Sequence, residues 1–418
     1  MNSTHVIGRI ASAFPALRHR NFLLFWLGQC ISLIGTWMQN IGQAWLVLQL
    51  TNSAYKLGIV SALQFLPVLL LSLFAGPFVD RFPKRKVLLF TQSSLMVLAL
   101  ALALLTYFNV VQYWHILVLA LLLGLINTLD NPTRQSFIIE LVGKEDLMNG
   151  IALNSSVFNL ARILGPAVAG LLIGLIGIAP CFFINAASFL AVILGLWLIN
   201  VPGKVAHTQR NVLGDTVEGL RYIRSKRLIL LPLVLLGLIS AFVMNFNVLI
   251  PVFAKQELGG EAVDYGLLMT AMGVGSFIAA LNLAARSKSG PRMKVVLWGA
   301  LGMSLIELIL GFEKQYLLAA VTLLAEGFFS ITATASINTT VQLNSDDAIR
   351  GRVMSVYSLV FGGVTPIGSL FAGGVSQALG AGSTFIISGA IGVLSVAAVT
   401  VLYRRSVASL PAADQAPP

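Results

Sequence analysis

Short polar breaks divide the sequence into about twelve apolar stretches, each near the roughly 20 residues that a helix needs to cross a bilayer. Only 10% of the residues are charged, whereas roughly 25% are charged in soluble domains. Because lipid offers no partner to an unpaired backbone group, stretches of this length favour helices. We predict an all-α integral membrane protein with spans at 22–50, 57–79, 87–108, 114–137, 149–176, 180–201, 228–254, 263–285, 295–312, 316–341, 352–379 and 383–403.

The net charge of +11 is typical of a nucleic-acid-binding protein, so the distribution of the cations matters. About 22 of the 27 Lys and Arg residues fall in alternate loops and in the terminal segments, whereas the opposite loops hold only Lys56, Lys255 and Lys314. Loops rich in Lys and Arg stay in the cytoplasm. We therefore predict that both termini are cytoplasmic and that the basic charge reflects topology, with no nucleic-acid partner.

A long polar connection at residues 202–227 divides the chain nearly in half, and its second part has the pattern of an amphipathic surface helix. Weak internal echoes relate the two parts: Ile31, Ser32 and Gly58 recur at Ile239, Ser240 and Gly266. Such repeats are typical of transporters with a site near the midplane between two units. The predicted organisation is a six-helix half at 1–201, the linker at 202–227, a second six-helix half at 228–403 and a tail at 404–418.

Polar side chains interrupt the first and seventh spans, where side chains that face lipid should be apolar. They are candidates for lining a substrate cavity, and the alternative is hydrogen bonding between helices with no ligand. The candidates are Trp37, Gln39, Asn40 and Gln43 in the first span, and Asn245 and Asn247 in the seventh. Amides and aromatics with few charges suit an apolar or zwitterionic cargo better than a polyanion.

Arg162 lies in the fifth span, about 13 residues or roughly 20 Å from its cytoplasmic end. A buried Arg stays charged and needs an acid, carbonyl groups or water. Two interpretations remain open: Arg162 takes part in binding substrate or in proton coupling, or it is a structural clamp.

Three acids lie inside predicted spans: Asp130, Glu307 and Glu326. Glu326 is about ten residues from the outer end of its span, near mid-bilayer. Burial disfavours the charged form of a carboxyl, which enables it to bind and release a proton near neutral pH. We predict proton coupling at Glu326 first and Asp130 second, with Glu307 more evenly balanced; the alternative for Glu326 is a permanently protonated structural acid.

The segment Gly76-Pro-Phe-Val-Asp80-Arg81-Phe-Pro-Lys84-Arg85 resembles the signature loop between the second and third helices of the major facilitator superfamily. Pro83 departs from the pattern, because the family usually has Gly there, and Pro restricts the backbone. The resemblance implies that Asp80 pairs with Arg134 and latches the inner side in the outward-facing state. A local pair between Asp130 and Arg134, one turn apart, is the alternative. The residues assigned to the latch are Gly76, Asp80, Arg81, Arg85 and Arg134.

Gly165, Pro166 and Gly170 resemble the fifth-helix motif of exporters in this superfamily, except that Ala169 replaces the first of its last two glycines. Proline removes a backbone hydrogen bond and glycine permits close helix approach, so we expect a kinked and tightly packed helix. Pro366 in the eleventh span corresponds to Pro166 and completes the predicted set of kink residues.

Three further motifs resemble the drug:proton antiporter branch that includes macrolide-efflux and enterobactin-exporter-like proteins: Trp37-Met-Gln39, Asp130-x-Pro132-x-Arg134-Gln135 and Asn159-x-x-Arg162-x-x-Gly165-Pro166. The resemblance implies a proton-coupled exporter of amphipathic small molecules, of drug or siderophore type, that works by alternating access in the bacterial inner membrane. Its expected partners are a small-molecule substrate, protons and membrane lipids, and we expect a monomer. The alternatives are an uptake symporter or facilitator, or a non-transporting receptor or lipid-handling protein.

The sequence has no Gly-x-x-x-x-Gly-Lys-[Ser/Thr], His-Glu-x-x-His or Gly-x-Ser-x-Gly stretch. This counts against ATP-driven transport and against a membrane protease or lipase. Cys30 and Cys181 lack the spacing of a metal site. We therefore predict a protein that is not an enzyme and has no cofactor, no metal and two free thiols.

Overall fold

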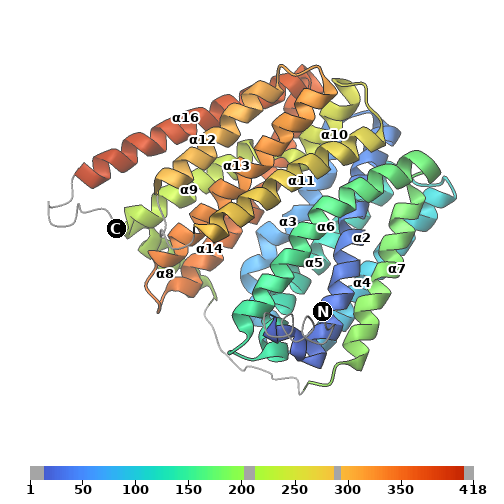
Figure 1. Ribbon diagram of the computed structural model, residues 1–418, viewed down its shortest axis with the longest axis horizontal. Coiled ribbons are helices and arrows are strands. Elements are labelled where there is room, and N and C mark those ends of the chain that lie inside the picture. The colour runs from blue at the N-terminus through green and yellow to red at the C-terminus, as the bar shows by residue number, and fades with distance from the viewer. Residues whose placement is uncertain (1–13, 202–211, 287–292, 409–418) are drawn as a thin grey trace, which may run out of the picture. The chain divides into compact units, whose positions relative to one another are not determined.

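The computed structural model describes residues 14–201, 212–286 and 293–408, and every regular element in these ranges is a helix (Figure 1). Within these ranges, twelve spans are long and apolar enough to cross a membrane, which confirms the predicted all-helical membrane fold. The elements are η1 (Pro15–Arg18), α2 (Arg20–Thr51), α3 (Ala54–Val79), α4 (Lys84–Tyr107), α5 (Tyr113–Val142), α6 (Leu147–Ile176), α7 (Ala179–Leu198), α8 (Val212–Ser225), α9 (Arg227–Phe242), α10 (Phe246–Gln256), α11 (Ala262–Ala285), α12 (Met293–Leu310), α13 (Tyr316–Leu343), α14 (Arg350–Gly363), α15 (Thr365–Leu379) and α16 (Ala381–Ala408).

The chain forms two compact units, residues 1–46 with 74–209 and residues 47–73 with 210–418. The boundary after residue 209 falls inside the predicted linker, of which residues 202–211 lie outside the described part of the chain, as does the tail from residue 409. The second unit includes the end of α2 and most of α3, because Gly58 on α3 meets the backbone of α15.

The first unit is held together by a core of large apolar side chains from α2, α4, α5 and α7. Phe25 and Phe137 pack edge to face, with ring centroids 5.6 Å apart. Gly28 lets α2 approach α7 closely, since a Cβ there would lie 2.9 Å from the Cα of Val192. This packing places α2, α4 and α5 side by side around the first cluster of charged residues described below.

In the second unit, α11 and α13 approach each other through a reciprocal pair of glycines. A Cβ on Gly275 would lie 1.8 Å from the carbonyl oxygen of Leu324, and one on Gly327 would lie 1.9 Å from that of Met272. Small residues permit such approach between membrane helices. The contact fixes the position of α13, which carries Glu326.

Two of the spans in the second unit are broken in the middle. The seventh span is interrupted at residues 243–245 between α9 and α10, where Asn245 donates a hydrogen bond to the Ala241 carbonyl (3.0 Å). The eleventh is interrupted at Val364, and Pro366 lies in the first turn of α15. Proline is tolerated there because the first turn has no partner for its missing N–H. In contrast, α6 continues through Pro166 without a break.

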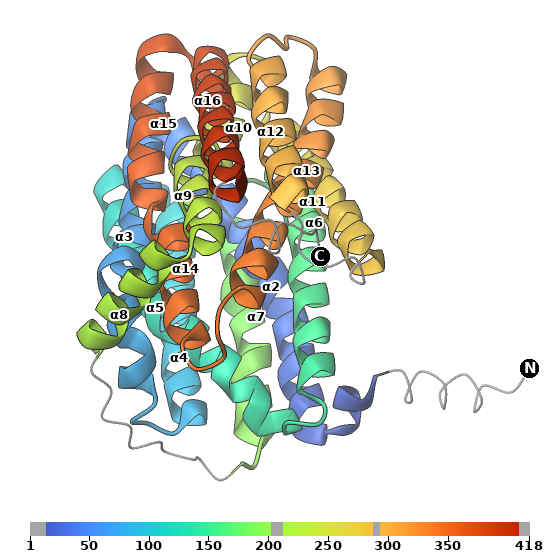
Figure 2. The ribbon, with the colours of Figure 1, turned by 90° about the vertical axis from the view of Figure 1, so that its left-hand side faces the viewer.

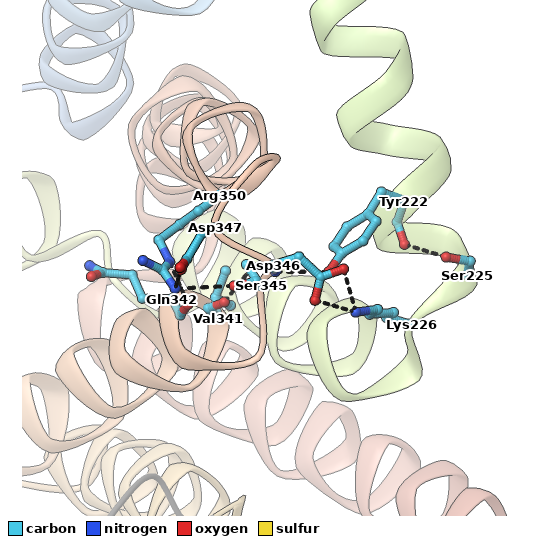
Figure 3. Close-up of polar contacts among 9 residues, drawn as sticks. All are labelled: Tyr222, Ser225, Lys226, Val341, Gln342, Ser345, Asp346, Asp347 and Arg350. Carbon is cyan, nitrogen blue, oxygen red and sulfur yellow. Dashed lines mark hydrogen bonds and ion pairs between the residues drawn. The ribbon is translucent and has the colours of Figure 1, made fainter.

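Helix α8 is the predicted amphipathic element, and it begins at Val212. It lies beside α14 (Figure 2), and Arg352 of α14 pairs with Asp215 (2.9 Å) and Glu218 (2.6 Å). At the other end, Lys226 contacts Asp346 at 2.9 Å, and Tyr222 accepts a hydrogen bond from the Asp346 backbone (Figure 3). The hydrogen bonds with Tyr222 and Asp346 raise the pKa of Lys226, and the one with Lys226 lowers the pKa of Asp346.

Candidate functional site

The first unit contains a buried charge network centred on Asp130 of α5, which has no exposed surface. Its Oδ1 accepts hydrogen bonds from Thr91 (2.6 Å) and Gln92 (2.8 Å) of α4, and its Oδ2 pairs with Arg134 one turn along α5. Arg134 in turn donates to Gln29 of α2 at 2.6 Å. An ionised carboxylate only accepts hydrogen bonds. Asp130 receives three, so its carboxylate is well supplied with donors, whereas the Nε of Arg134 has no described partner.

In this structure Asp80 and Arg134 of the predicted latch each pair with a residue four positions away in the sequence. Asp80 contacts Lys84 at 2.7 Å, and Arg134 contacts Asp130, so the local pair is the one present in this structure. Arg85 donates to the carbonyl groups of Leu196 (2.7 Å) and Trp197 (2.9 Å), at the last turn of α7. A cation is favourable there because the last carbonyl groups of a helix lack partners and carry partial negative charge. Arg81 is exposed, and no atom crowds Gly76.

The second unit contains a buried pair of acids of the opposite character. Glu307 on α12 and Glu326 on α13 both have no exposed surface. None of their four carboxyl oxygens has a hydrogen-bond partner among the described residues. An ionised carboxylate without donors is very costly in such surroundings. The site therefore favours the neutral form of at least one of the two acids.

The packing of α12 against α13 brings the two acids close together. These helices are antiparallel neighbours: Gly299 meets Ala333, and Gly302 meets the ring of Phe329. The same register places Glu307 at about the level of Glu326 on the neighbouring helix, and both side chains are buried there. Two carboxyls in one low-dielectric site do not ionise together readily.

The polar residues of the first span divide between structural and accessible positions. Gln39 is buried and accepts a hydrogen bond from Asn185 of α7 (2.6 Å), which is the contact between helices that the alternative interpretation describes. Gln43 is buried, Asn40 is exposed, and Trp37 packs edge to face with Phe158 of α6 at 5.8 Å.

The two asparagines of the seventh span differ in the same way. The Oδ1 of Asn245 is buried and has no partner in the described part of the chain, next to the point where Gly368 of α15 approaches. Asn247 is exposed. The structure therefore gives Asn245 an unused acceptor at the break between α9 and α10.

Arg162 on α6 has less than its full set of partners. One of its terminal nitrogens donates to Asn159 at 3.3 Å, while its buried Nε has no partner, and no carboxylate pairs with it among the described residues. Gly165, one turn later, packs against Trp37. Arg162 therefore lies where the tightly packed part of α6 begins.

Three residues that complete the Asp130 network were not among the predicted site residues: Gln29, Thr91 and Gln92. Thr91 and Gln92 begin a run of four polar residues, Thr91 to Ser94, in a mainly apolar span, and this was the signal that could have marked them. No group of three or more His, Cys, Asp or Glu residues that could hold a metal ion occurs in the ranges that the structure describes, and Cys30 and Cys181 are free.

Comparison with known proteins adds independent evidence. The staphyloferrin A transporter of Staphylococcus aureus is 27% identical over 391 residues, which cover 92% of this chain and 93% of that protein. The multidrug efflux pump Tap of Mycolicibacterium fortuitum is 27% identical over 355 residues, covering 82% of this chain and 86% of the pump. The crystal structure of the nucleoside transporter NupG has the same fold, with a TM-score of 0.74 at 13% identity over 93% of this chain and 99% of that chain.

These relatives are transporters and not enzymes, and their likeness extends over nearly the whole length of the chain. The family described as "Transmembrane secretion effector" matches residues 11–418, which include both the Asp130 network and the buried acids Glu307 and Glu326. The chain is a multi-pass membrane transporter and belongs to this family of the major facilitator superfamily.

Proposed function

We propose that this transporter is a proton-coupled exporter of amphipathic small molecules, with the acid pair Glu307–Glu326 as its proton site. The observation that carries the proposal is the missing set of donors: both carboxyls are fully buried, and none of their oxygens has a described partner. Such a site holds a proton easily and releases it when water or a cation gains access. Coupling then requires only that access to the pair alternates between the two sides of the membrane.

Asp130 is the weaker candidate for the proton site. Its carboxylate already has the Arg134 guanidinium and two neutral donors as partners. Protonation of Asp130 would break a buried ion pair and leave Arg134 without a counter-ion, which is costly. We therefore assign Asp130 to the structure of the first unit and the proton to the second.

Export is the direction favoured by the names of the relatives, among which Tap is an efflux pump and the family is one of secretion effectors. The proposal includes the location of the protein in a bacterial inner membrane with cytoplasmic termini, on the distribution of its cations. It also includes a single chain as the working unit.

The proposed latch belongs to the outward-facing state. In that state Arg134 contacts Asp80 in addition to Asp130. In the present structure Asp80 pairs with Lys84, and Arg134 pairs with Asp130. Asp80→Asn then shifts the protein toward the inward-facing state, and spin-label distances between α5 of the first unit and α14 of the second report the shift. Distances identical to those of the unmodified protein would remove Asp80 from this role.

The test uses inside-out membrane vesicles and a substrate selected by ligand-induced thermal shift from antibiotics, dyes and siderophores. Collapse of the pH gradient should stop uptake into the vesicles, and Glu326→Gln should abolish the gradient-dependent component. Glu145→Gln is the matched control, because it removes an exposed acid outside both clusters. Uptake that survives collapse of the gradient in the unmodified protein would contradict proton coupling.

A further inference from the structure

One face of α6 carries exposed polar side chains within a membrane span. Ser155, Asn159 and Arg162 follow each other at intervals of four and three residues, so they lie along one side of the helix. Ser155 is exposed, and Asn159 and Arg162 are partly exposed. Polar groups that face hydrocarbon are costly, so the polar side of a membrane helix faces the bundle interior or a water-filled cavity. The polar side of α6 extends about 10 Å along the helix, up to Arg162.

Arg162 is the only charged residue of α6, and its charge has no counter-ion among the described residues. The guanidinium group has five donors in a planar fork, of which the structure uses one, on Asn159. Asp130 is not the counter-ion of Arg162, because Asp130 already pairs with Arg134. Within a span, an unpaired guanidinium that is partly open to water is suited to a ligand that supplies the missing negative charge.

An aromatic pair lies beside this group. Phe158, one turn before Arg162, packs edge to face against Trp37, and Phe158 is 45% exposed. A ring surface next to a cation suits a ligand that has a flat apolar body and a carboxylate, since the carboxylate forms paired hydrogen bonds with the guanidinium.

We infer that Arg162, with Asn159 and Phe158, forms a binding site for the carboxylate of an amphipathic aromatic substrate. The inference rests on the proposed transport of amphipathic small molecules and adds the chemical class of the cargo. It also refines the expectation from the sequence, because an apolar cargo without an acidic group would leave Arg162 unpaired.

The experiment measures equilibrium binding to purified transporter in nanodiscs, at constant pH and with no gradient. Rhodamine 110, which has a free carboxylate, is compared with rhodamine 123, its methyl ester, by fluorescence anisotropy. Charge-assisted hydrogen bonds predict that the acid binds at least about tenfold more tightly than the ester. Arg162→Met should remove this preference, and Arg162→Lys should keep part of it. Lys86→Met, which removes an exposed cation elsewhere in the same unit, should bind as the unmodified protein does.

Equal affinity of the unmodified protein for acid and ester, or no binding of the acid, would overturn the inference. A preference that survives in Arg162→Met would overturn it too. Thermal unfolding separates a binding role from a clamp: a site for ligand predicts that Arg162→Met unfolds at an unchanged or higher temperature, and a lower temperature would assign Arg162 to the structure. Because binding is measured without a gradient, failure of proton coupling leaves these results unaffected.

Discussion

The two units of this transporter bury carboxyl groups in opposite ways. Asp130 in the first unit is surrounded by donors from α4 and α5, and its partner Arg134 is connected to α2. Glu307 and Glu326 in the second unit are buried without a hydrogen-bond partner among the described residues. Burial alone therefore does not distinguish the two kinds of acid; the donors around the carboxyl group do. Donors favour the charged form of a buried acid, whereas burial without donors favours its neutral form.

The largest expected effect is on the stability of the first unit. Arg134→Met leaves the Asp130 carboxylate buried without its counter-ion, and loss of one partner of a buried ion pair costs about 3–5 kcal/mol. The unfolding free energy of Arg134→Met, measured in denaturant and detergent, should fall by about that amount. Asp130→Asn combined with Arg134→Met should recover much of the loss. If Arg134→Met alone were as stable as the unmodified protein, the structural role of the Asp130–Arg134 pair would be contradicted.

Removal of one acid of the second unit should affect the protein in the opposite way to Arg134→Met. The unfolding free energy should change little, and proton-coupled transport should fall strongly. Glu307→Gln keeps the shape of the side chain and removes one of the two buried titratable carboxyls. Gradient-driven transport should fall at least about tenfold, equivalent to about 1.4 kcal/mol. The unfolding free energy should stay within about 1 kcal/mol, because no hydrogen bond to Glu307 is lost. A destabilised Glu307→Gln would indicate a structural acid.

A smaller effect is expected at Thr91, one of the neutral donors to Asp130. Thr91→Val removes one hydrogen bond at nearly constant volume, and such bonds between membrane helices are worth about 0.6 kcal/mol on average. Denaturant titration should show a loss of this size, and gradient-driven transport should persist. Loss of coupling in Thr91→Val with unchanged stability would move the proton site to Asp130.

The smallest effect is expected at the exposed pair of Lys226 and Asp346 (Figure 3). The lowered pKa of Asp346 means that its contribution is present above the usual pKa of Asp, about 3.9, and is lost as the pH falls below it. The raised pKa of Lys226 means that its contribution is lost as the pH rises beyond about 10.4. Between these limits, Asp346→Asn should speed hydrogen exchange in α8 and leave the thermal unfolding temperature unchanged. A large drop in that temperature would contradict the weak effect expected of an exposed pair.

Much of the fold follows from local patterns in the sequence. The lengths of the apolar stretches predicted twelve spans, and the spacing of Asp130 and Arg134 predicted that they could pair. The break of the seventh span between α9 and α10 was signalled only by polar residues, without its exact position.

The arrangement of the candidate site was harder to predict, because it depends on contacts between helices. The register between neighbouring spans decides whether Thr91 donates a hydrogen bond to Asp130 and whether Glu307 lies near Glu326. This register is set by close contacts such as that between Gly302 and Phe329, and no periodicity along one helix contains it.

The most direct test of the central claim is infrared spectroscopy of the purified transporter at neutral pH, which detects protonated carboxyl groups by their C=O stretching band. If Glu307 or Glu326 holds a proton, the spectrum should contain such a band from a carboxyl shielded from water. Glu307→Gln combined with Glu326→Gln should then remove the band, and Asp130→Asn should leave it unchanged. A band that disappears in Asp130→Asn and persists in the double variant would place the proton in the first unit and contradict the account.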